Sequence, residues 1–362
     1  MNLLPHFSLS YAEARKKFIA AARARALAVD THLLPERVGA DGEPLASDVA
    51  VLGSNDASGV LLITSATHGI EGYCGSGVQI ALLHDDAFVR AVTDARIAVA
   101  FVHAVNPYGF SHGRRVNEDN VDLNRNFRDF NLPPPVNAGY ADVHALLIPP
   151  TWPPSPEHEA KNGAYIAAHG ARAYQAAVTG GQYAFPDGLF YGGARPTWSN
   201  RTMRAVLRRH ARGRRRLGWI DVHTGLGPRG HGEKIFAGRN NPAELARARS
   251  WWGADVTSIY DETSSSSEFT GLMFNAIYDE SPDVECVGIG LEFGTLPLPA
   301  MLQALRADHW LHVHPEAAPT VRSAITRQMR DAFYVDADDW KEQVYAQTRD
   351  ALLAALARLA ES

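Results

Sequence analysis

Three side chains of the sequence have the types and the spacing of ligands for a metal ion. His68 and Glu71 form an HxxE pair directly after an apolar run, and His223 directly follows another apolar run much later in the chain. Two imidazoles and one carboxylate can hold a Zn²⁺ ion and leave one coordination position open for water. Because an open position distinguishes catalytic from structural zinc sites, we expect one Zn²⁺ per chain and a hydrolytic reaction.

The residues around these ligands favour their convergence. Gly69 and Gly72 give the HxxE pair a tight turn. In open α/β sheets, ligands bind beyond the carboxyl ends of strands, where His68 and His223 would lie. Asp221 precedes His223 by two residues and could support that imidazole, although side-chain alternation along a strand leaves direct contact open. Each ligand alone could be an ordinary polar residue, so the prediction depends on all three together.

A second histidine cluster competes for the metal. His309, His312 and His314 lie close together, and Pro315 ends their segment abruptly. No glycine turn of the kind found in a catalytic cleft surrounds them. We therefore expect a partly exposed segment near the end of a helix instead of a metal site.

A cluster of arginine and asparagine side chains follows another apolar run. It comprises Arg114, Arg115, Asn117, Asn124 and Arg125. The guanidinium group presents a fork of donors that matches a carboxylate with two hydrogen bonds, so the cluster could bind an anionic substrate group. In isolation, a polar turn in which Arg125 pairs with Asp122 would explain the same residues.

Two stretches of this segment resemble the zinc carboxypeptidases of the carboxypeptidase A type. They are Asn106-Pro-Tyr-Gly-Phe110 and Val121-Asp-Leu-Asn-Arg-Asn-Phe127, and both lie between the HxxE pair and the second histidine, as in that family. The resemblance implies that Asn124 and Arg125 hold the terminal carboxylate of a substrate. It also implies that Arg115, in preference to its neighbour Arg114, polarises the scissile carbonyl.

The resemblance continues toward the C-terminus. Leu291-Glu-Phe-Gly-Thr295 ends an apolar run where the family carries its general base, which implies this role for Glu292. A buried glutamate near an activated water can accept the water's proton and later deliver it to the leaving amine. Ile259-Tyr-Asp-Glu-Thr-Ser-Ser-Ser-Ser267 is similar to the stretch that holds the family's substrate-capping tyrosine. This similarity implies Tyr260, with Tyr278 as the alternative.

Departures from the family pattern leave the substrate open. Gly294 and Thr295 stand where the digestive members carry an arginine soon after the base. The stretches His68-Gly-Ile-Glu-Gly72 and Asp221-Val-His-Thr-Gly-Leu-Gly227 also resemble the aspartoacylase and succinylglutamate desuccinylase branch, which hydrolyses N-acyl amino acids. The chain looks most similar to a bacterial group of this superfamily.

Three functions are therefore considered. The first is a metallocarboxypeptidase that cleaves a peptide's amide bond next to a free carboxylate. The second is a zinc amidohydrolase or deacylase that acts on small N-acyl amino acids. The third is a non-catalytic binding protein that retains the cleft.

The elements that must position these residues alternate along the chain. Short apolar runs that suit buried strands are separated by helical patterns. This order indicates an α/β fold, a three-layer sandwich in which helices flank a central mixed, mostly parallel sheet, as in the zinc carboxypeptidases. We expect a single zinc-hydrolase domain over residues 1–362. Its apolar runs are 60–65, 96–104, 218–222, 256–260 and 286–293, and its other features are a helix at 10–29, an irregular proline-rich insertion at 132–156 and a C-terminal helix at 341–360.

Composition argues against several other classes of protein. With 362 residues, 46% hydrophobic content and a net charge of −5, the chain can bury a large core and shows no bias toward nucleic acid or anionic membranes. Cys74 and Cys286 are too few for a disulfide framework. No run approaches the ~18 apolar residues of a membrane span, and no secretory signal opens the chain. We expect a cytoplasmic protein, with a homo-oligomer possible if the C-terminal helix packs on a second subunit.

Overall fold

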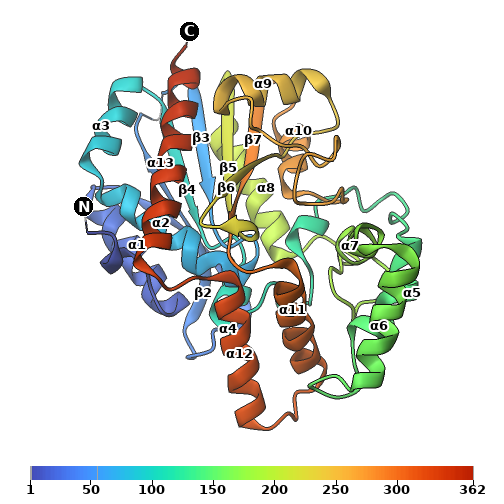
Figure 1. Ribbon diagram of the computed structural model, residues 1–362. Coiled ribbons are helices and arrows are strands. Elements are labelled where there is room, and N and C mark those ends of the chain that lie inside the picture. Colours follow the sequence, from blue (N-terminus) through green and yellow to red (C-terminus); the bar gives the residue numbers. More distant parts are fainter. Residues whose placement is uncertain (1, 55, 362) are drawn as a thin grey trace.

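A mixed sheet of seven strands runs through the middle of the molecule (Figure 1). The computed structural model describes residues 2–54 and 56–361. The strands are β1 (Val29–Val38), β2 (Pro44–Leu52), β3 (Gly59–Thr64), β4 (Ala98–His103), β5 (Arg216–Arg229), β6 (Gly232–Phe236) and β7 (Glu285–Gly294). Their order is β1-β2-β4-β3-β5-β7-β6. The four central strands β4, β3, β5 and β7 are parallel. The strands β1 and β2 on one side and β6 on the other add antiparallel pairs, with β1 and β6 at the two edges.

Helices cover both faces of this sheet, which confirms the predicted α/β sandwich (Figure 1). The helices of the described residues are α1 (Tyr11–Ala24), α2 (Gly72–His84), α3 (Asp86–Ala95), α4 (Pro107–His112), α5 (Ala138–Leu147), α6 (Pro156–His169), α7 (Ala171–Thr179), α8 (Trp198–Ala211), α9 (Pro242–Trp252), α10 (Ala276–Glu280), α11 (Leu298–Val313), α12 (Pro319–Phe333) and α13 (Asp338–Ala360). One face packs against α1, α2, α3 and α13, and the other against α8 and α10.

Burial on both faces explains the nearly continuous apolar runs of the central strands. In β3, Leu61 and Ile63 belong to the core under α13, whereas Val60 and Leu62 belong to the core under α8. Successive side chains of a strand point to opposite faces, so a strand covered twice needs apolar residues at every position. This is the reason that these runs were recognisable in the sequence.

The structure corrects several predicted bounds. The first helix ends at Ala24 instead of residue 29, because Ala26 takes a left-handed φ of 58° and β1 begins at Val29. The last helix begins at Asp338, three residues before the predicted 341. The run 256–260 forms only an isolated bridge, between Ile235 and Thr257, and not a strand. The antiparallel strands β1, β2 and β6 were not predicted.

The proline-rich insertion at 132–156 is not irregular throughout, because it contains α5. Asn137 caps this helix by accepting a hydrogen bond from the backbone N–H of Tyr140. Tyr140, Val143 and Leu147 form its buried face, at the spacing of a helix with one apolar side. With α6 and α7 it forms a group of helices beside the sheet (Figure 1).

The C-terminal helix α13 packs on the core of its own chain. It contacts α2, α3 and α9 and the strands β3 and β5. Trp340 in its first turn is fully buried, and its indole Nε1 donates a hydrogen bond to the carbonyl of Gly294 at 3.1 Å. The helix therefore holds the end of β7, the strand that carries Glu292.

Among the helices of residues 2–54 and 56–361, none combines the length and hydropathy that a bilayer crossing requires.

Replacement of Trp340 by alanine is expected to lower the free energy of unfolding by about 3–5 kcal/mol, because it removes a buried indole and leaves a cavity. Chemical denaturation at equilibrium measures this change. The exposed neighbour Glu342 provides the control, since Glu342→Ala should change stability by less than about 0.5 kcal/mol. Equal effects of the two substitutions would contradict the anchoring role of Trp340.

Candidate active site

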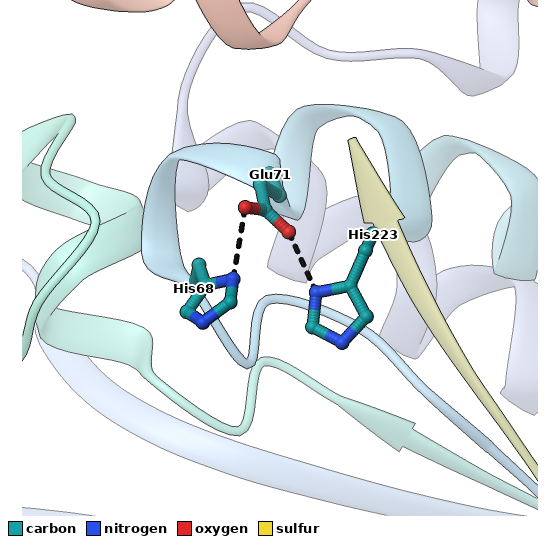
Figure 2. A group of neighbouring side chains, drawn as sticks. All are labelled: His68, Glu71 and His223. Atoms are coloured by element: carbon teal, nitrogen blue, oxygen red, sulfur yellow. Dashed lines mark hydrogen bonds and ion pairs between the residues drawn. The ribbon is translucent and has the colours of Figure 1, made fainter. Parts of the chain in front are cut away.

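The predicted metal ligands lie together at the carboxyl ends of β3 and β5. His68 stands at the start of a 3₁₀ turn, η2 (Gly69–Glu71), and His223 lies in β5. Figure 2 shows Glu71 between the two imidazoles, with Nδ1 of His68 2.9 Å from Oε1 and Nδ1 of His223 2.8 Å from Oε2. The ligand atoms all lie within 4.8 Å of one another. The three side chains are thus arranged around one point.

This arrangement fits a divalent cation. Both imidazoles present the same ring nitrogen, Nδ1, to the carboxylate, so one ion could replace the two hydrogen bonds with three coordinate bonds. Within the described residues, no other set of three His, Cys, Asp or Glu side chains gathers in this way. The competing histidines at 309, 312 and 314 lie at the end of α11, as expected, and His309 and His314 contact backbone carbonyls.

A carboxylate supports the far nitrogen of each imidazole. Nε2 of His223 lies 2.7 Å from Asp221 Oδ2, and Nε2 of His68 lies 3.3 Å from Asp122 Oδ1. The contact of Asp221, left open by the sequence, follows because residues two apart on a strand point to the same face. Such partners fix the orientation of an imidazole ligand and raise its basicity. Burial lowers the pKa of His223, but Asp221 and Glu71 together raise it well above its ordinary value.

Close backbone contact brings the arginine segment to the metal ligands. The backbone N–H groups of Gly69 and Ile70 donate to the carbonyls of Arg115 and Arg114. A Cβ atom at Gly69 would lie 2.0 Å from the carbonyl carbon of Gly109 in α4, so only glycine allows this approach. The HxxE turn and the start of the arginine segment are therefore packed as one unit.

Arg115 lies beside the metal ligands and Arg114 does not. The Nε–H of Arg115 donates to Asp122 at 3.0 Å, Nη1 lies 3.4 Å from Glu71 Oε1, and Nη2 lies 2.8 Å from His68 Nε2. Burial lowers the pKa of Arg115, but the charges of Asp122 and Glu71 raise it above its usual value. Arg114 instead donates to Asp308 at 3.2 Å.

Asn124 and Arg125 line the same cavity from the 3₁₀ turn η3 (Leu123–Arg125). The Arg125 guanidinium carbon lies 3.8 Å from the ring centre of Phe269 and 5.6 Å from that of Phe190. Burial lowers the pKa of Arg125 to about 10, so it remains a cation at neutral pH. The side-chain oxygen of Asn124 accepts a hydrogen bond from the backbone N–H of Met273.

Glu292 lies next to His223 on the neighbouring strand, because the two residues are register partners in the parallel pair of β5 and β7. Its Oε1 accepts a hydrogen bond from the backbone N–H of Leu226 at 2.9 Å. Burial and the nearby charge of Glu71 raise the pKa of Glu292. The pKa of Glu71 is lowered instead. Its burial raises the pKa, but the two imidazoles lower it by more. Two nearby carboxyl groups with pKa values moved apart are typical of a catalytic site.

Neither candidate tyrosine is among the residues that line the cavity. The Tyr260 hydroxyl donates to the carbonyl of Gly238 at 3.1 Å, and that of Tyr278 donates to Glu244. Aromatic residues that do line the cavity include Phe190 and Phe269, which the sequence did not single out. No motif marks them, since both lie in loops whose path depends on the tertiary structure.

The molecule has a carboxypeptidase-like α/β fold, and its buried His-Glu-His triad could bind a metal ion. Two solved structures of thrombin-activatable fibrinolysis inhibitor are similar in fold. One matches with a TM-score of 0.53 and 11% identity and covers 98% of this chain and 77% of its own. The other, the bovine protein in complex with tick carboxypeptidase inhibitor, matches with a TM-score of 0.51 and 10% identity over 98% of this chain and 97% of its own. Residues 7–347 match the model of a family described as a protein of unknown function, DUF2817, and the chain belongs to this family. A search of curated proteins finds no match.

Replacement of Asp221 by asparagine is expected to weaken metal binding by about 10- to 100-fold, because His223 loses the carboxylate that orients it. Competition against a chelator of known affinity measures the effect. Asp283→Asn at an exposed position is the control and should bind metal normally. Unchanged affinity in the Asp221 variant would show that this carboxylate does not support the ligand.

Proposed function

We propose that the protein is a zinc-dependent hydrolase that cleaves an amide bond next to a free carboxylate, most simply as a metallocarboxypeptidase. The observation that carries this proposal is the position of Glu71 between the Nδ1 atoms of His68 and His223. Glu292 on the adjacent strand and two arginines in the same cavity, the partly buried Arg115 and the buried Arg125, supply the remaining groups.

Zinc suits this donor set, because two imidazoles and one carboxylate are the ligands of several catalytic zinc sites. When bound, Zn²⁺ would lower the pKa of water to about 7 and polarise a carbonyl group. His68, Glu71 and His223 would hold it, while Asp122 and Asp221 keep the imidazoles oriented.

Glu292 is proposed to act as the general base. The Leu226 N–H holds Oε1, which leaves Oε2 to accept a proton from the attacking water. The same carboxyl group would then deliver that proton to the leaving amine. Its raised pKa favours both steps, because a base works best when its pKa lies near the working pH.

The two arginines are proposed to act on different parts of the substrate. Arg115, beside His68 and Glu71, donates to the carbonyl oxygen as negative charge develops there. Arg125 and Asn124 bind the substrate's carboxylate and so align the scissile bond. A substrate without a free carboxylate would lose this alignment.

A zinc amidohydrolase acting on small N-acyl amino acids is the second candidate. The same residues serve both reactions, and the candidates differ in what lies on the acyl side of the bond. The second candidate is supported by the stretches His68-Gly-Ile-Glu-Gly72 and Asp221-Val-His-Thr-Gly-Leu-Gly227, which resemble the aspartoacylase and succinylglutamate desuccinylase branch.

Glu292→Gln is expected to keep the metal and to lower kcat by about 10²- to 10⁴-fold, since the amide cannot accept a proton. His68→Ala is expected to lose the metal itself. Elemental analysis and hydrolysis of N-acylated phenylalanine test both variants, with Glu316→Gln at an exposed position as the control. A metal-loaded Glu292→Gln protein with full activity would refute the base assignment, and a wild-type protein that binds zinc but hydrolyses nothing would indicate the non-catalytic alternative.

The rate is also expected to depend on pH through Glu292. The base must be a carboxylate, so kcat/KM should rise as pH increases through its pKa. Because burial raises this pKa, the rising limb should lie above the value of about 4.3 for an ordinary glutamic acid. A pH profile on metal-loaded protein tests this, with circular dichroism to verify folding. A limb at the ordinary value would contradict the proposed environment of Glu292.

A further inference from the structure

We infer that Phe190 is a positioning residue of the proposed reaction, whose ring sets the distance between the guanidinium groups of Arg115 and Arg125. This distance decides how far a substrate's carboxylate can lie from the scissile carbonyl group. The inference rests on the proposed function and adds to it a residue that no motif of the sequence marks.

The ring of Phe190 is shared by the two arginines of the cleft. Its centre lies 5.2 Å from the guanidinium carbon of Arg115 and 5.6 Å from that of Arg125. All three residues line the same cavity. An aromatic face attracts a cation that lies within about 6 Å of the ring centre. One side chain therefore supports both of the cations that are proposed to bind the substrate.

Arg125 in particular depends on such support. Burial is the main cause of its lowered pKa, and the charge of Arg115 lowers that pKa as well, so the two cations repel each other. Arg115 is held by the carboxylate of Asp122. Arg125 has weaker anchors, because its Nη1 and Nη2 donate only to the backbone carbonyls of Asn124 and Thr179. Its buried Nε has no hydrogen-bond partner in the part of the chain that the structure describes.

The backbone of Phe190 is strained. Its φ of 53° lies in the left-handed region, which a bulky residue rarely adopts and which glycine adopts freely. The side chain is nevertheless buried, with 5% of its surface exposed. Strained residues cluster at functional sites, where the surrounding structure enforces their conformation. A stability cost at this position is explained if the ring itself is needed there.

The surrounding loop enforces this conformation through the carbonyl groups of residues 189–192, all four of which accept hydrogen bonds. The backbone N–H of Gln182 donates to the carbonyl of Phe190 at 3.1 Å, and its side-chain amide donates to the preceding carbonyl at 3.2 Å. The backbone N–H of Asp122 and the side-chain amide of Asn126 donate to the next two carbonyls, each at 2.8 Å. These two donors flank the turn η3, so the loop is fixed to the segment that presents the arginines.

The spacing of the guanidinium groups matters because the proposed reaction binds two groups of one substrate. Arg115 is proposed to contact the scissile carbonyl, and Arg125 the carboxylate. A β-amino acid places its carboxylate one carbon–carbon bond, about 1.5 Å, farther from the amide than an α-amino acid does. Because a misplacement of about 1 Å can lower a rate by about 10²-fold, a fixed spacing should favour the amides of α-amino acids.

The experiment compares two substrates on zinc-loaded protein. They are N-acetyl-alanyl-phenylalanine and the same compound ending in β-homophenylalanine, whose carboxylate lies one carbon farther from the amide. In the wild-type protein, kcat/KM should be higher for the first by at least about tenfold. Phe190→Ala should lower this ratio by at least about fivefold, because the arginines are no longer held at one spacing.

Two further variants separate the ring of Phe190 from a general effect on the loop. Phe190→Tyr retains a ring and should keep the ratio within about twofold of the wild-type value. Phe185→Ala removes a ring that stacks on His144 in the same loop region and does not line the cavity, so the ratio should not change. An unchanged ratio in Phe190→Ala would overturn this inference and leave the proposed hydrolase intact.

A binding measurement distinguishes this inference from the proposed function. Titration calorimetry with 3-phenylpropanoate on metal-free protein reports on the carboxylate site without any reaction. Phe190→Ala should weaken binding by at least about fivefold, and Phe185→Ala should not weaken it. Weakened binding in a protein whose wild type hydrolyses neither substrate would refute the hydrolase and retain the support of Arg125 by Phe190. Equal affinities of the wild type and Phe190→Ala would refute that support.

The strain has a test of its own. Phe190→Gly should unfold at a higher denaturant concentration than Phe190→Ala, because glycine adopts the left-handed conformation without a steric cost. Both variants should discriminate equally poorly between the two substrates, since both lack the ring. Chemical denaturation at equilibrium measures the first effect. A more stable alanine variant would contradict the strained conformation, and a glycine variant with wild-type discrimination would show that the ring is dispensable.

Discussion

The architecture depends on a buried carboxylate, Glu71, that must be shared by two imidazoles from distant parts of the chain. An ionised carboxylate inside a protein is strongly unfavourable unless positively charged or hydrogen-bonding groups surround it. His68 follows β3 and His223 belongs to β5, so only the parallel pairing of these strands brings both rings to the same carboxylate. The central sheet is therefore the scaffold of the site as well as the core of the molecule.

A series of hydrogen bonds connects this site to the core under α8. Asp221 supports His223 and accepts from the hydroxyl of Thr64, which in turn accepts from the indole Nε1 of Trp219 at 2.9 Å. Trp219 is buried in the core under α8. Because the polar atoms in this series of hydrogen bonds all have partners, the imidazole of His223 is held as rigidly as the packed strand. The precise position of His223 thus comes from the core, whereas His68 and Glu71 are positioned by the turn that packs on the arginine segment.

The sequence predicted the place of a side chain wherever a single local rule determines that place. Strand-end residues converge in a parallel sheet, so the sequence could predict that the triad lies together. Arg115 and Glu292 were predicted only from the resemblance to the zinc carboxypeptidases, and both line the same cavity as the triad. The tyrosines could not, because Tyr260 lies in a loop that folds away toward Gly238. The edge strand β1 could not be predicted either. The strand β1 is exposed along most of its length and therefore lacks the apolar run of a central strand.

Asp122 contacts three parts of the site at once. One of its oxygens faces His68 and also accepts from the backbone N–H of Asn124, and the other accepts from Arg115. The imidazole of His68, the guanidinium group of Arg115 and the turn that presents Arg125 thus share one carboxyl group. A single substitution of Asp122 would therefore disturb the imidazole, the guanidinium group and the turn together, even though they come from three separate stretches of the chain.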